Sequence, residues 1–269
     1  MPICLSCRLV FAFVGLVLTT LPALSHEFWI EPQKYQVDSG RPVIADLRNG
    51  QKFTGSKLVY FARRTRRFDI MQGDQVTPYQ GRMGDLPAFH LDQIDDGLLV
   101  ISHETVPETL TYETWEMFQA FVTHKGFVGI IQSHHARGLP EQDFTETYSR
   151  HAKALIAIGD GTGTDSLQGM ETEFVALANP YTDDLSLGIP VQLFYQGQPR
   201  AETQVEVFER APDGTVSIFL RHTDIQGYAL IPVKAGHTYL LDAVVIRPAP
   251  KAEGPVWQSL WAALTFAVP

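Results

Sequence analysis

The chain has 269 residues, with 30 Asp and Glu against 21 Lys and Arg and a formal net charge of −9. This acidic balance argues against nucleic-acid binding, which requires a basic surface against the phosphates. The length is sufficient for one large or two modest hydrophobic cores.

The first 25 residues have the pattern of a secretory signal peptide. Arg8 precedes an apolar stretch over residues 9–18, and Ala23 and Ser25 are the small residues that a signal peptidase requires. The apolar stretch is too short to span a bilayer comfortably. We therefore expect cleavage before His26, a periplasmic protein, and no transmembrane segment in the mature chain.

Both cysteines, Cys4 and Cys7, lie in the expected signal peptide. The mature chain would then have neither a disulfide bond nor a thiolate metal ligand, although its compartment permits disulfides. Packing alone would have to stabilise it.

Residues 26–160 are expected to form an N-terminal β-rich domain with inserted helices. Short runs of β-type residues at 42–48, 57–61 and 98–102, separated by Gly, Pro and Asp, predict strands.

Two segments of this domain have helical spacing. A helix is predicted between Thr111, as its cap, and Gly126, from the spacing of Trp115, Phe118, Phe121 and Val122. A second helix is predicted after Pro140 from Phe144, Tyr148, Ala152 and Leu155, although residues 154–158 also have the composition of a buried strand.

Residues 159–165, Gly-Asp-Gly-Thr-Gly-Thr-Asp, are predicted to be a flexible turn at a domain boundary, since no Lys-Ser/Thr pair of a phosphate loop follows them. Residues 166–269 are expected to form an immunoglobulin-like β-sandwich in which the tail, 257–268, returns as a packed strand. Its other strands are predicted at 174–177, 191–195, 204–208, 217–220, 229–233 and 239–246. The predicted fold class is mainly β, with two β-rich domains and a few short helices.

A histidine at a free N-terminus is an unusual metal ligand. The α-amine and the imidazole Nδ1 of His26 could close a six-membered chelate on one cation, and both lose their protons at little cost near neutral pH. Two such nitrogens suit Ni, Co, Cu and Zn. We expect His26 to bind a divalent transition metal together with a histidine from the fold.

Eight other histidines could supply that group. His103 is predicted as the ligand because it follows the apolar run 99–102 at a strand end, from which a rigid scaffold could aim its ring. His90 has a comparable position after Phe89. The remaining six are His124, His134, His135, His151, His222 and His237. For each of these histidines, an ordinary surface or hydrogen-bonded role is the simpler alternative.

A small basic cluster could contact an anion or membrane headgroups, although a solvated loop is the simpler interpretation. It consists of Arg63, Arg64, Arg66 and Arg67.

The expected mature start, residues 26–32 (His-Glu-Phe-Trp-Ile-Glu-Pro), resembles the opening of a periplasmic family associated with nickel and cobalt uptake, the NikM-like family, formerly a domain of unknown function. The likeness continues at 148–155, 173–175, 179–181, 197–199, 223–227 and 257–266. It implies a periplasmic, β-rich protein with a C-terminal sandwich and a role in transition-metal handling. Relatives often carry a histidine in the late strand where this chain reads Ala-Val-Val-Ile at 243–246, so only His26 is carried over by position as a ligand.

The leading hypothesis is a non-enzymatic periplasmic protein that binds Ni²⁺ or Co²⁺, with Cu²⁺ as a further candidate, and serves an uptake transporter in the inner membrane. Two alternatives remain open. One is a copper histidine-brace oxygenase acting on a polysaccharide, and the other is a structural or interaction sandwich without a metal.

Overall fold

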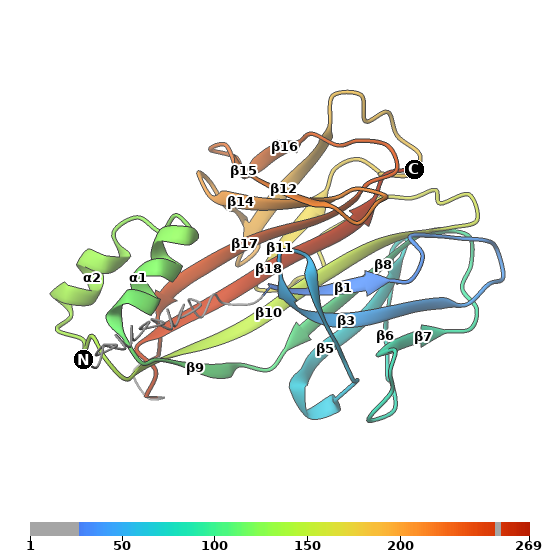
Figure 1. Ribbon diagram of the computed structural model, residues 1–269. Helices are drawn as coiled ribbons and strands as arrows, with labels where there is room; N and C mark the ends of the chain where they lie inside the picture. Colours follow the sequence, from blue (N-terminus) through green and yellow to red (C-terminus); the bar gives the residue numbers. More distant parts are fainter. Residues whose placement is uncertain (1–26, 251–253) are drawn as a thin grey trace, which may run out of the picture.

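The computed structural model describes residues 27–250 and 254–269, so the expected signal peptide and His26 lie outside the described residues. It is mainly β, as predicted, with three sheets and two short α-helices (Figure 1). Within these ranges, no helix is both long enough and apolar enough to cross a membrane.

A ten-stranded sheet forms the centre of the molecule. Its main path runs β15 (Val216–His222), β14 (Gln204–Arg210), β17 (Thr238–Pro248), β18 (Trp257–Ala267), β10 (Phe144–Ile158), β8 (Gly97–Thr105), β5 (Thr65–Gln72) and β6 (Gln75–Pro78). Two more strands, β2 (Gln36–Val37) and β9 (Glu108–Tyr112), also pair with β10. Because β10 pairs with β18, in parallel, the sheet contains strands that precede residues 159–165 in the sequence as well as strands that follow them.

Two smaller sheets cover opposite faces of the central sheet. The first contains β1 (Glu27–Pro32), β3 (Val43–Gln51), β4 (Thr54–Leu58) and β7 (Phe89–Leu91), and the second contains β11 (Thr172–Ala176), β12 (Ile189–Tyr195), β13 (Gln198–Pro199) and β16 (Tyr228–Ile231). Alternation along β8 separates the two cores: Leu99 and Ile101 join the first, whereas Leu98 and Val100 join the second. The second core has the sandwich arrangement predicted for the C-terminal half, and it also includes residues of β5, β8 and β10.

Two helices, α1 (Trp115–His124) and α2 (Ile130–Ala136), lie beside one end of β10, β17 and β18 (Figure 1). Their aromatic side chains form a third core with Trp257 and Trp261 of β18. The first predicted helix is confirmed, but its cap is Thr114 rather than Thr111. Thr111 belongs to β9, where it pairs with Thr145 of β10.

The second predicted helix is wrong, because residues 144–158 form the single long strand β10. Other layers cover both faces of this strand, and a strand buried on both faces lacks the simple alternation of apolar and polar residues. Helix α2, which contains His134 and His135, was not predicted, and the 3₁₀ helix η1 (Ala62–Arg64) was not predicted either.

Residues 159–165 are hydrogen-bonded to their surroundings at several points. The Leu98 amide donates to the Thr162 carbonyl at 2.7 Å, and the Asn179 side chain donates to the carbonyls of Gly161 and Gly163 at 2.8 and 3.0 Å. A glycine is required at 161, where φ is +65° and an added Cβ would lie 2.7 Å from the Cβ of Ala157. The predicted turn is therefore packed against the neighbouring strands.

Candidate functional site

His103 lies near the end of β8 in an aromatic environment. Only 2% of the residue is exposed, and its ring centroid is 5.4 Å from that of Phe28 and 4.8 Å from that of Phe68. Burial lowers the pKa of His103 to about 3, so its imidazole is neutral at physiological pH. A neutral imidazole is the form that binds metals and accepts hydrogen bonds.

The hydrogen bonds of Thr65 define which ring nitrogen of His103 carries the proton. The Thr65 hydroxyl donates to the Phe61 carbonyl at 3.2 Å, and the same oxygen lies 3.2 Å from His103 Nε2. With its hydrogen already used, this oxygen accepts from Nε2–H, which leaves the lone pair on Nδ1. His103 Nδ1 has no hydrogen-bond partner among the described residues.

A cavity of about 380 Å³ lies beside this ring, at the junction between the first covering sheet and β8–β10. Its apolar wall consists of Phe28, Leu47, Leu58, Val59 and Phe61. This volume lies within the range of small-molecule sites in proteins.

The polar lining of the cavity contains two arginines and one carboxylate. Arg150 is 7% exposed and lies 5.0 Å from the ring centroids of both Tyr148 and Trp261. Arg64 is largely exposed and lies 3.5 Å from the Glu108 carboxylate, which also accepts a 2.8 Å hydrogen bond from Tyr148. The cavity lining therefore has an excess of positive charge in a chain that is acidic as a whole.

A separate ionic cluster surrounds Glu27, the residue that follows His26 in the sequence. Lys125 Nζ donates to Glu206 and Asp242 at 2.8 Å each, and His124 Nε2 lies 3.3 Å from Glu206. Burial raises the pKa of Glu27 to about 7, and the charges of Asp242 and Glu206 act in the same direction. The Lys125 ammonium lies between the carboxylates of Glu206 and Asp242 and forms an ion pair with each of them.

The other histidines have structural or surface positions. His134 is buried with both nitrogens used: Trp257 Nε1 donates to Nδ1 at 3.0 Å, and Nε2 is 2.9 Å from the Pro140 carbonyl. His151 is buried 3.5 Å from Glu104, and burial lowers its pKa to about 4. The rest are exposed or partly exposed, namely His90, His124, His135, His222 and His237.

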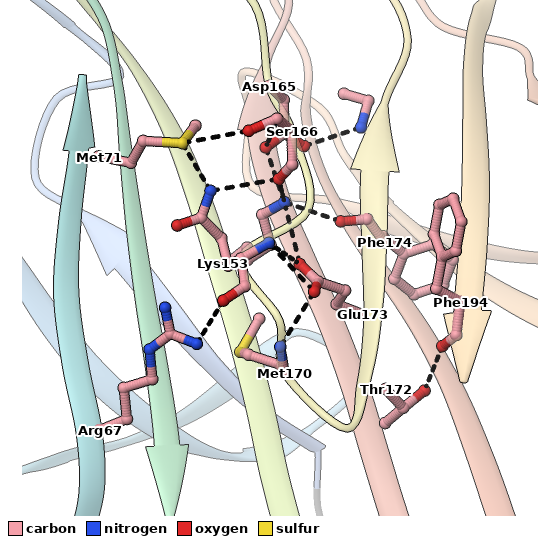
Figure 2. Close-up of polar contacts among 12 residues, drawn as sticks. Arg67, Met71, Lys153, Asp165, Ser166, Met170, Thr172, Glu173, Phe174 and Phe194 are labelled. Carbon is pink, nitrogen blue, oxygen red and sulfur yellow. Dashed lines mark hydrogen bonds and ion pairs between the residues drawn. The ribbon is translucent and has the colours of Figure 1, made fainter. Parts of the chain in front are cut away.

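Figure 2 shows a second buried ionic group, centred on Lys153 of β10. Its ammonium lies 2.6 Å from Asp165 and 3.5 Å from Glu173, and it donates to the carbonyls of Ser166 and Phe174 at 3.0 Å each. The carboxylates also accept backbone N–H groups, including that of Ala176 to Asp165. Because every charge is paired, this group connects segments of the fold and offers no open binding position.

Of the two predicted metal ligands, the structure places His103 in a cavity, whereas His26 lies outside the described residues. Within residues 27–250 and 254–269, no three His, Cys, Asp or Glu side chains are arranged to hold a metal ion. A site with three such ligands at His103 would therefore have to include a residue outside these ranges, such as His26. Glu108, Tyr148 and Arg150 were not predicted as site residues. The related sequence signals were the basic cluster that contains Arg64 and the family likeness at 148–155, which includes Tyr148 and Arg150.

Two solved structures have a distant similarity to the chain. The D0-D1 domain of Intimin is 14% identical over 89% of this chain and 97% of that chain, with a TM-score of 0.20. A tetra-tandem repeat in the extending region of a large adhesion protein is 10% identical over 90% of this chain and 49% of that chain, also with a TM-score of 0.20. Neither similarity supports an inference at this TM-score.

No curated protein matches the chain. A family model described as a domain of unknown function, DUF4198, matches residues 23–247. This match covers most of the sequence and includes β1 to β16 and nearly all of β17. The chain therefore belongs to the DUF4198 family.

Proposed function

We propose that the protein is exported to the periplasm and binds Ni²⁺ or Co²⁺ through the α-amine and imidazole of His26 and the imidazole of His103. The observation that carries the proposal is the buried, neutral His103, whose Nδ1 lacks a partner among the described residues. Phe28, two residues after His26, packs against that ring at 5.4 Å. The proposal thus places both histidines at one cavity.

The surroundings of His103 suit a metal ligand. Metal-binding histidines usually donate their second ring N–H to a fixed acceptor, which orients the ring, and Thr65 provides that acceptor here. Nitrogen ligands favour late first-row ions, which agrees with nickel or cobalt and leaves copper as an alternative cargo.

Equilibrium dialysis with Ni²⁺, Co²⁺ and Cu²⁺ tests the metal site. The protein should begin at His26, a start confirmed by intact mass, and should retain about one ion per chain. One extra glycine before His26 removes the terminal chelate but keeps the imidazole, and His103→Gln removes the second ligand. Each change should weaken retention at least about tenfold.

His222→Gln is the matched control, because His222 is exposed and lies outside the cavity. This variant should retain metal like the wild type. Equal retention by all four proteins would remove the metal site from the proposal.

The proposed role is delivery of the metal to an uptake transporter in the inner membrane. Cells that lack the protein should then accumulate less radiolabelled nickel or cobalt from a metal-poor medium. The gene for the wild-type protein should restore uptake and the His103→Gln form should not. Unchanged uptake in its absence would reject the transport role while leaving metal binding intact.

A further inference from the structure

The cavity beside His103 contains more than a metal site requires. One wall is apolar and includes Val59 and Phe61, which are themselves 45% and 37% exposed at the surface. Large apolar side chains at the edge of a cavity lose unfavourable contact with water when an apolar ligand covers them.

The charges of the lining select an anion. Two arginines and one glutamate line the cavity, so the lining has one more cationic than anionic side chain. Arg150 is nearly completely buried, so its interaction with an anion in the cavity is weakly screened by water. The planar guanidinium groups of Arg64 and Arg150 match the geometry of a carboxylate.

His103 supplies a second, independent indication of a ligand. Several buried polar side-chain atoms lack a hydrogen-bond partner among the described residues, and two of them, His103 Nδ1 and Asn49 Oδ1, belong to residues that line this cavity. A water molecule held beside a bound carboxylate would provide the missing donor, because it can donate one hydrogen to the ring nitrogen and the other to the carboxylate.

We propose that this cavity binds a small organic monocarboxylate with an apolar or aromatic group, and that it does so without a transition metal. The carboxylate lies toward Arg64 and Arg150, and the apolar group lies against Phe28, Val59 and Phe61. This binding goes beyond the proposed metal function and does not depend on His26.

Isothermal titration with 3-phenylpropionate as the probe, in the presence of a metal chelator, tests this proposal. Its neutral amide has the same shape but lacks the charge, and acetate has the charge but lacks the ring. We expect 3-phenylpropionate to bind at least about tenfold more tightly than either of them, because each loses one of the two sources of affinity.

Two pairs of surface variants locate the binding without disturbing the core. Arg64→Gln should weaken binding of 3-phenylpropionate about tenfold, whereas Arg82→Gln, an exposed arginine outside the cavity, should have no effect. Val59→Asp should abolish binding by placing a negative charge in the cavity wall. Val76→Asp, at a valine that is 49% exposed elsewhere, should leave binding unchanged.

The outcomes separate this proposal from the metal site. Absence of binding, equal binding of the acid and its amide, or equal effects of Arg64→Gln and Arg82→Gln would each overturn it. Binding of the acid by a protein that fails to retain metal would reject the metal site and support the carboxylate site. Metal retention without acid binding would reject the carboxylate site and support the metal site.

Discussion

Glu146 is a buried carboxyl group that affects how stability depends on pH. It is 1% exposed, and burial raises its pKa to about 7 despite hydrogen bonds donated by Ser259 and by Tyr112, the latter at 2.9 Å. Since its pKa in the unfolded chain is near 4.5, the folded state holds the proton more tightly. Stability is therefore lost as pH rises from about 4.5 to 7 and is not regained above this range.

Glu146→Gln should reduce this dependence. Between pH 4.5 and pH 8, the free energy of unfolding of the variant should rise relative to that of the wild type by about 3 kcal/mol. Urea denaturation at the two pH values measures the difference. Glu141→Gln, at an exposed glutamate, is the control, and an identical pH response in both variants would contradict the assignment.

At the scale of elements, Lys153 connects β10 to the segment before β11. Lys153→Met would leave Asp165 and Glu173 buried without their cation, and should cost about 3–5 kcal/mol of unfolding free energy. Arg82→Met, which removes an exposed pair with Asp85, should cost less than about 1 kcal/mol. Denaturant titrations compare them, and similar small losses would show that the buried group is not required.

The elements that sequence predicted well are those with a simple local pattern. Helix α1 has an apolar face with regular spacing, β14 alternates polar and apolar residues in its first half, and β17 is largely apolar. β10 was misassigned because other layers bury both of its faces, so its polar residues also lie in the interior and the strand lacks a simple alternation. Lys153 pairs there with Asp165, and Glu146 accepts a hydrogen bond from Ser259. Local periodicity cannot reveal partners that lie more than a hundred residues away, such as Ser259.

The same limit applies to the site. His103 could be selected from its place at a strand end, but the cavity depends on β8, β9 and β10 pairing with one another and on β1 and β3 covering them. Arg150 and Tyr148 were not recognised as lining residues because they were assigned to a helix, which would have pointed them in other directions. Arg64 was noticed only as a member of a basic cluster.

At the scale of the whole molecule, β18 is an interior strand of the central sheet although it is the last strand in the chain. It pairs with β17 on one side and with β10 on the other, and contributes Trp257, Trp261, Leu264 and Phe266 to two cores. A chain that ends at residue 256 should lack a cooperative thermal transition in circular dichroism, whereas a chain that ends at Val268 should unfold like the full protein. Cooperative unfolding of the shorter chain would show that the rest of the sheet is stable alone.

The position of β18 also determines when the newly made chain can fold. While synthesis is under way, β10 and β17 each have an open edge, and the sheet can close only after residues 257–267 have left the ribosome. Until then the chain cannot reach its native state, and its unpaired strand edges make it prone to aggregate. A chain that completes its fold this late can still pass through a narrow translocation channel, as the proposed export requires.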